Sequence, residues 1–278
     1  MAPPPAPSDE LEIRLLGTFE ITRHGVPIDV LGDRLRTAMA SLALAVGRVV
    51  AADALIDVVW SDRLPGNPRS GLQNLITRLR KVLGVDVIRS VGRGYLLEIA
   101  PEQVDVVRFQ RHLDAAAGAE SAGDTAAVRR HLRAAEQLWR GEPLTGVESE
   151  VLRLREVQSL TERYLTAVEQ RIDIDLAGGR VGGLVSELVG LTTRHRLRES
   201  LWLRLIKVLH RQGRQSEALT AYHDLRTLLA DELGVQPSPD LQEVYQAILT
   251  SDLPAPASAE SGPAGEPAPA AARPDWAV

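Results

Sequence analysis

The sequence predicts an α+β N-terminal region followed by an all-α region of helical repeats, so that the fold is mainly helical. Between residues 11 and 100 the period of the apolar residues changes from two to 3.6 and back to two, which indicates strands, then helices, then strands. Between residues 101 and 250 the helical period continues throughout and is interrupted by short breaks that contain glycine.

The two ends of the chain differ in composition from the middle. The first ten residues hold four prolines, and residues 251–278 are rich in proline and alanine with few large apolar side chains. Such segments cannot bury enough apolar surface to offset the entropy lost on ordering, so we expect 1–10 and 251–278 to be disordered. The rest divides into an N-terminal domain over 11–100 and a C-terminal domain over 101–250.

Strands are expected at both ends of the N-terminal domain. Residues 11–15 and 19–22 alternate apolar and polar side chains, and a further turn is expected at His24-Gly25, before Val26-Pro27-Ile28. Residues 87–91 and 95–99 read as a β-hairpin that turns at Gly92-Arg93-Gly94.

Three helices are expected between these strands, and each has one apolar face. The third begins after Pro68 and stops at Gly84. The apolar faces are formed by Leu35, Ala38, Met39 and Leu42 in the first helix, by Leu55, Ile56, Val59 and Trp60 in the second, and by Leu72, Leu75, Ile76, Leu79, Val82 and Leu83 in the third.

The C-terminal domain is expected to hold seven helices. Its breaks lie at Gly123, Gly141-Glu142-Pro143, Gly178-Gly179, Gly213 and residues 234–239. Trp202-x-x-Leu205 is followed, sixteen residues after the tryptophan, by Ala218-x-x-x-Tyr222, which is the tetratricopeptide spacing. Ile206 and Leu209 stand where that pattern prefers glycine and tyrosine, so the match is partial. We expect an array of helical hairpins with surfaces for binding another protein.

The third helix of the N-terminal domain carries the candidate binding face. On a helical wheel its apolar residues fill an arc from roughly 280° to 40°, with Leu72 at zero. In a major groove, arginine can bind guanine, asparagine or glutamine can bind adenine, and threonine can contact either a base edge or a thymine methyl. From Arg69 to Tyr95 six basic residues face one acid, Asp86, a local charge of +5. The opposite arc holds no carboxylate and consists of Ser70, Gln73, Asn74, Thr77, Arg78, Arg80 and Lys81.

An isolated helix with this pattern is more often an ordinary amphipathic helix whose basic face is solvated. The context favours DNA binding instead. The helix is the third of three, a Pro-Gly-Asn-Pro turn sets its start, and the hairpin that follows places Arg93 between glycines, where it could enter a minor groove.

Residues 11–100 resemble an OmpR-type winged helix-turn-helix domain, and the resemblance is carried by residues 32–36, 72–83 and 92–95. Residues 101–250 resemble the bacterial transcriptional activation domain, from Val104-Asp105 through residues 218–222 to residues 232–238. Together they are similar to the Streptomyces antibiotic regulatory protein family.

This resemblance implies an activator of secondary-metabolite (antibiotic) biosynthesis genes, located in the cytoplasm and associated with the nucleoid. It would bind direct repeats in double-stranded promoter DNA as a homodimer and recruit the RNA polymerase holoenzyme, including its sigma factor. Because only ten residues precede the first strand, no receiver domain is expected, and aspartate phosphorylation is not expected to be the switch.

The resemblance also implies roles for individual residues. The major-groove residues would be Ser70, Gln73, Asn74, Thr77 and Arg78. The phosphate contacts would be Arg69, Arg80 and Lys81, and the wing contact would be Arg93. The loop that touches the polymerase would include Asp62, Arg63, Leu64 and Asn67.

An enzyme or a membrane protein is disfavoured. No P-loop, Gly-x-Ser-x-Gly or His-Glu-x-x-His motif is present, and zero cysteines exclude thiolate metal sites and a cysteine nucleophile. His112 and His131 lie in helices of one hairpin and could meet, although a surface or core histidine is more frequent than a metal ligand. We therefore expect no catalytic activity, no cofactor and no metal. No apolar run approaches the roughly 20 residues that span a bilayer, and because the N-terminal residues have neither a basic stretch nor an apolar core, no signal peptide is expected.

The second alternative is a helical-repeat scaffold or ligand sensor that does not read DNA directly. Residues 101–250 contain 22 acidic and 19 basic side chains, so this half is not itself a DNA surface. Its expected contacts are with protein.

Overall fold

The structure, a computed structural model, describes residues 11–61 and 64–250. The predictions of disorder for 1–10 and 251–278 lie outside the described residues. The described chain divides into two compact units, the first ending at Ile174 and the second beginning at Asp175. The change from strands to helices near residue 100 therefore falls inside the first unit.

The first unit opens with a three-stranded antiparallel sheet in the order β1-β2-β3. Its strands are β1 (Leu11–Arg14), β2 (Glu20–Arg23) and β3 (Val26–Pro27). Ile13 pairs with Ile21, and both side chains are buried. His24 and Gly25 join β2 to β3 and both have positive φ, 50° and 78°, as a type I′ hairpin turn requires.

Three helices share a buried core with this sheet: α1 (Asp33–Leu44), α2 (Ala52–Val59) and α3 (Pro68–Leu83). The predicted apolar faces are buried with one exception. Val82 was expected in the core but is 42% exposed. It lies at the edge of the apolar arc and in the last turn of α3, so its side chain points past the core.

A second three-stranded sheet follows in the order β4-β6-β5. Its outer strand β5 (Ile88–Val91) and central strand β6 (Gly94–Leu97) form the predicted hairpin. The third strand, β4 (Val49–Ala51), was not predicted. It has only three residues, and its two outer side chains are exposed, so it gives no alternating apolar signal.

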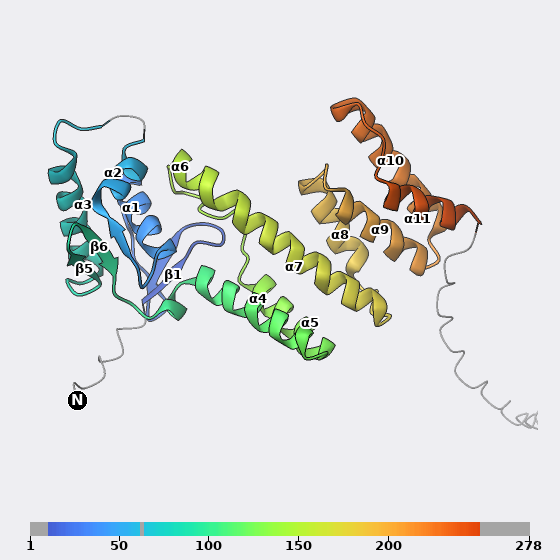
Figure 1. The fold of residues 1–278 in the computed structure, drawn as a ribbon, viewed down its shortest axis with the longest axis horizontal. Coiled ribbons are helices and arrows are strands. Elements are labelled where there is room, and N and C mark those ends of the chain that lie inside the picture. Colours follow the sequence, from blue (N-terminus) through green and yellow to red (C-terminus); the bar gives the residue numbers. More distant parts are fainter. Residues whose placement is uncertain (1–10, 62–63, 251–278) are drawn as a thin grey trace, which may run out of the picture. The chain divides into compact units, whose positions relative to one another are not determined.

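The remainder of the first unit is helical (Figure 1). After the short 3₁₀ helix η1 (Pro101–Gln103), helices α4 (Asp105–Ser121) and α5 (Thr125–Gln137) form a hairpin around Gly123, whose φ is 73°. The short helix α6 (Glu150–Leu152) leads through a π-helical turn, η2 (Arg153–Val157), into α7 (Gln158–Ala177), whose last three residues belong to the second unit.

The second unit contains α8 (Leu184–Arg194), α9 (Glu199–Arg211), α10 (Gln215–Leu233) and α11 (Pro239–Thr250). With α4, α5 and α7 they make seven helices of at least eleven residues in the described part of 101–250, the predicted number. Leu205 and Ala218 are buried where α9 and α10 pack together. No helix among the described residues has both the length and the apolar character that crossing a membrane would need.

Candidate nucleic-acid interface

Helix α3 has well-defined ends. The Asn67 side-chain oxygen accepts a hydrogen bond from the backbone N–H of Ser70 at 3.1 Å, and Pro68 occupies the first turn, where its missing N–H costs nothing. At the other end Gly84 has a φ of 105° and donates its N–H to the Arg80 carbonyl at 2.9 Å. These caps fix where the helix begins and ends.

One face of α3 anchors it to the core. Leu72, Ile76, Leu79 and Leu83 are at most 1% exposed, and Leu75 is 8% exposed. Burying large aliphatic side chains in this way contributes about 1.5 to 3 kcal/mol each. The rotation of the helix is therefore fixed.

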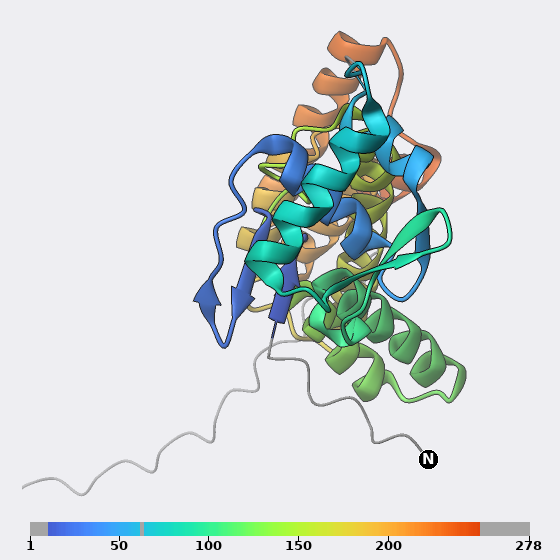
Figure 2. The same cartoon turned by 90° about the vertical axis from the view of Figure 1, so that its left-hand side faces the viewer.

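The opposite face of α3 is open among the described residues (Figure 2). The Thr77 hydroxyl donates to the Gln73 carbonyl of its own helix at 2.9 Å, so its methyl group and lone pairs remain available to a ligand. The exposed predicted residues on α3 are Arg69, Ser70, Gln73, Asn74, Thr77, Arg78 and Lys81.

The basic side chains at this face differ in their partners. Among the described residues the side chains of Arg78, Lys81 and Arg93 form no hydrogen bond or ion pair. Arg69 lies 3.4 Å from the Asp53 carboxylate, and both side chains are more than two-thirds exposed, so this pair is weak. Arg80 is half-buried and donates to the Ile88 carbonyl and to the Ser90 hydroxyl.

The β5–β6 hairpin, with Arg93 at its tip, stands beside α3. Gly92 takes the first position of the turn with a φ of 56°, as in type II′ hairpins. A Cβ atom on Gly94 would lie 2.3 Å from the Val50 carbonyl oxygen, so glycine allows β6 to approach β4 closely. The Arg93 carbonyl accepts the Ala52 N–H at 2.9 Å, which fastens the hairpin to the start of α2.

A cleft of about 370 Å³ separates the first turns of α3 from the hairpin. Its walls include Arg69 and Gln73 on one side and Ser90 and Arg93 on the other. Two guanidinium groups thus border a space that can receive anionic phosphates.

The loop before α3 is described in part. Asp62 and Arg63 lie outside the described residues. Leu64 is 62% exposed, and Asn67 is exposed while it caps α3. Their predicted contact with the polymerase stays a prediction.

The two histidines of the α4–α5 hairpin do meet. The Nδ1 atoms of His112 and His131 are 3.4 Å apart and the ring centroids 5.7 Å apart, so the two nitrogens face each other between the rings. Among the described residues no group of three or more histidine, aspartate and glutamate side chains could hold a metal ion.

Residues 104–249 match the family model described as the bacterial transcriptional activator domain. The chain belongs to this family. The match begins after the strands and the three helices of the N-terminal part, whose likeness to OmpR-type domains stays a prediction.

Curated relatives of this family member carry regulatory names. The chain is 41% identical over 269 residues to "Regulatory protein AfsR" of Streptomyces coelicolor, covering 96% of this chain and 27% of AfsR. It is 35% identical over 253 residues to "Regulatory protein DnrI" of Streptomyces peucetius, covering 87% of this chain and 93% of DnrI. The chain thus spans about a quarter of AfsR and nearly all of DnrI.

A solved structure of a family relative has a similar fold. It is titled Mycobacterium tuberculosis EmbR in complex with a low affinity phosphopeptide. The TM-score is 0.79 at 32% sequence identity, over 87% of this chain and 65% of EmbR. The similarity therefore extends to both the strand-containing and the helical parts of the chain.

Proposed function

We propose that this protein is a sequence-specific DNA-binding transcriptional activator that places α3 in the major groove of promoter DNA. The observation that carries the proposal is the exposed face of α3, which holds no carboxylate and leaves Arg78 and Lys81 without partners among the described residues. Ser70, Gln73, Asn74, Thr77 and Arg78 read base edges, and Arg69, Lys81 and Arg80 approach phosphates.

The hairpin supplies the second contact. Arg93 at its tip enters the neighbouring minor groove, and the cleft beside Arg69 receives the phosphate backbone between the two grooves. The regulatory names of AfsR, DnrI and EmbR support a role in transcription. The proposed targets are secondary-metabolite (antibiotic) genes.

The proposed protein partners come from the transcription machinery. Two copies bind direct repeats as a homodimer, and the loop around Leu64 and Asn67 contacts RNA polymerase holoenzyme through its sigma factor. The site of action is the cytoplasm, at the nucleoid. No catalytic step is part of this function.

Binding of the full chain to duplexes from the promoters around its own gene tests the proposal. Fluorescence anisotropy at several salt concentrations should give a steep decrease of affinity with salt, because phosphate contacts release counterions. Footprinting should locate protected repeats, and random duplex of equal length is the control. Absent or salt-insensitive binding on every promoter would favour the helical-repeat scaffold or ligand sensor instead.

A further inference from the structure

The segment between α5 and α6 lies along the connection between β1 and β2. Leu144 donates its N–H to the Leu15 carbonyl at 2.9 Å, and Thr145 donates to Gly17 at 3.1 Å. In return Phe19 donates its N–H to the Thr145 carbonyl at 2.8 Å. Residues more than 120 positions apart in sequence thus pair like neighbouring strands.

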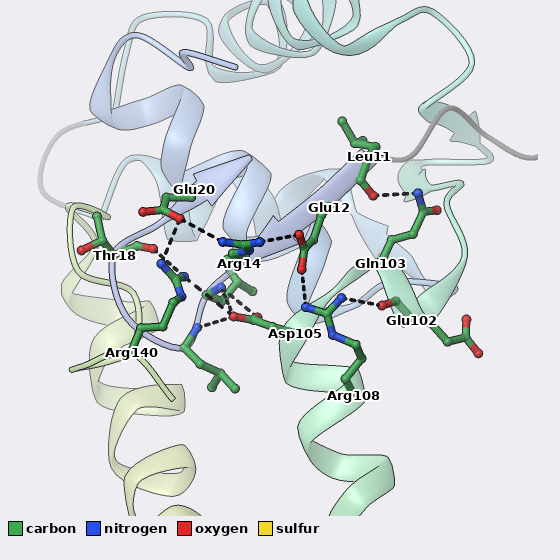
Figure 3. Close-up of polar contacts among 12 residues, drawn as sticks. Leu11, Glu12, Arg14, Thr18, Glu20, Glu102, Gln103, Asp105, Arg108 and Arg140 are labelled. Atoms are coloured by element: carbon green, nitrogen blue, oxygen red, sulfur yellow. Dashed lines mark hydrogen bonds and ion pairs between the residues drawn. The ribbon is translucent and has the colours of Figure 1, made fainter. Parts of the chain in front are cut away.

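A buried carboxylate holds the same connection from the helical side (Figure 3). Asp105, at the start of α4, is 2% exposed. Its two carboxylate oxygens accept the Leu15 N–H at 2.8 and 2.9 Å, and one of them also accepts the Leu16 N–H at 2.9 Å. A carboxylate suits this place because two adjacent donors converge on it, and hydrogen bonds to a charged acceptor are stronger than neutral ones.

Arg140, three residues after the end of α5, contacts the same connection between β1 and β2. Its backbone N–H donates to the Leu16 carbonyl at 2.8 Å, and its Nη2 donates to the Thr18 carbonyl at 3.0 Å. The Arg140 guanidinium also pairs with Glu20 at 3.0 Å and lies 3.9 Å from Asp105 (Figure 3). A Cβ atom on Gly17 would come within 2.9 Å of the Arg140 Cβ, so the close approach requires glycine.

Apolar residues of the strand-containing part and of the helical part are also buried together in shared clusters. Leu144, Val147 and Leu152 belong to the buried cluster that contains the apolar residues of β1 and α1. Leu16, which follows β1, instead packs with Phe109, Ala135 and Leu160 of the helices. The Ser149 hydroxyl, which is buried, donates to the Val58 carbonyl at the end of α2 at 3.0 Å. Neither the strand-containing part nor the helical part buries its core alone.

We propose that Asp105 is the positioning residue of a joint that makes residues 11–174 one cooperative folding unit. The strands and α1–α3 are then not an independent domain that ends near residue 100. Helices α4 and α5 keep a fixed orientation relative to α3. Any surface of these helices that binds another protein therefore has a fixed orientation relative to α3 as well. This inference goes beyond the proposed function and holds whether or not α3 binds DNA.

Hydrogen exchange of the full chain, followed by mass spectrometry, tests the joint. Amides inside α1 and α5 should exchange at rates that report a common opening reaction. Asp105→Asn places an amide group opposite an N–H donor and should speed exchange in both helices by the same factor, about tenfold or more. Asp114→Asn, an exposed change on the same helix, is the matched control and should leave both rates unchanged.

The readout in α1 is decisive because the hydrogen bonds and the ion pair described above for the Asp105 side chain go to Leu15, Leu16 and Arg140, which lie outside that helix. Faster exchange in α5 without any change in α1 would overturn the proposal, as would different opening reactions for the two helices in the unmodified chain. If Asp105→Asn does not fold, Arg140→Ala provides the same comparison, because it removes the side-chain contacts to Thr18, Glu20 and Asp105 and keeps the carboxylate of Asp105. It should speed exchange in α1 and α5 equally, and unequal effects would contradict the joint.

Discussion

Arg80, in the last turn of α3, donates a hydrogen bond from its Nε to the carbonyl oxygen of Ile88, the first residue of β5, at 2.8 Å. Its Nη2 also donates to the Ser90 hydroxyl at 3.0 Å. The helix and the hairpin are therefore held at a fixed separation. This separation decides whether α3 and Arg93 can reach neighbouring grooves of one duplex.

Replacement of Arg80 should loosen the hairpin. We expect Arg80→Ala to lower the free energy of unfolding by about 1 to 2 kcal/mol, because hydrogen bonds from a charged donor to Ile88 and Ser90 are lost at a partly exposed site. Urea unfolding followed by circular dichroism measures this. Lys81→Ala is the control, since Lys81 is exposed without a partner among the described residues and should change stability by less than about 0.5 kcal/mol. Equal losses in both variants would contradict the role of Arg80.

Arg78 and Lys81 should differ in how they affect DNA binding. Arg78→Ala should cost about 1 to 3 kcal/mol of binding free energy on the footprinted site and relax the base preference, because a contact to base edges is lost. Lys81→Ala should weaken binding to all sequences alike and reduce the salt slope by about one. Anisotropy titrations on the footprinted and random duplexes measure both effects. Equal loss of affinity for the footprinted and the random duplex in Arg78→Ala would contradict the role given to Arg78.

Gly94 should tolerate no side chain. In Gly94→Ala the new Cβ would meet the Val50 carbonyl oxygen at 2.3 Å, so β4 and β6 must separate. We expect a loss of more than about 1 kcal/mol in the free energy of unfolding. Gly118→Ala is a matched control, because nothing lies within 4 Å of its new Cβ and the position is inside α4. That variant should gain about 0.5 to 1 kcal/mol, and a loss in it would contradict the comparison.

His112 should make the stability of the α4–α5 hairpin depend on pH. Burial lowers the pKa of His112 below its ordinary value of 6.5, and the nearby positive charges of His131 and Arg108 act in the same direction. The unfolded chain therefore takes up a proton at a higher pH than the folded chain. The stabilisation is complete above about pH 6.5 and decreases as the pH falls through that value towards the lower folded pKa.

Thermal unfolding between about pH 7.5 and 5 measures this effect. The melting temperature should fall less steeply with decreasing pH in His112→Gln than in the unmodified protein. His223→Gln, an exposed change in the second unit, should keep the original slope. Parallel pH profiles for the unmodified protein and His112→Gln would exclude the titration of His112 as the cause.

Local sequence patterns were sufficient to predict the long helices. The three helices of residues 11–100 were predicted because each places apolar side chains on one face, and the α3 boundaries followed from Pro68 and Gly84. The exposed face of α3 was predicted from the same wheel. Arg80 lies at the margin of the polar arc. The wheel predicted that its side chain is exposed, but it is half-buried because the β5–β6 hairpin contacts it.

Long-range relationships were beyond the reach of these patterns. Asp105 follows a valine and reads as the start of a helix, and nothing near it in sequence indicates that its partners are the amides of Leu15 and Leu16, about ninety positions away. Leu144 and Val147 lie in a loop, where periodicity gives no sign of burial. Such partners become visible only when the chain is folded.

The interlocked cores of the first unit restrict how chimeric regulators can be assembled. Exchange of only residues 11–100 between two relatives would leave the Leu144, Val147 and Leu152 of one parent facing the strands of the other. Crossovers that keep residues 11–174 from a single parent avoid this mismatch. We therefore expect DNA preference and the α4–α5 hairpin to be inherited together when these proteins diverge by recombination.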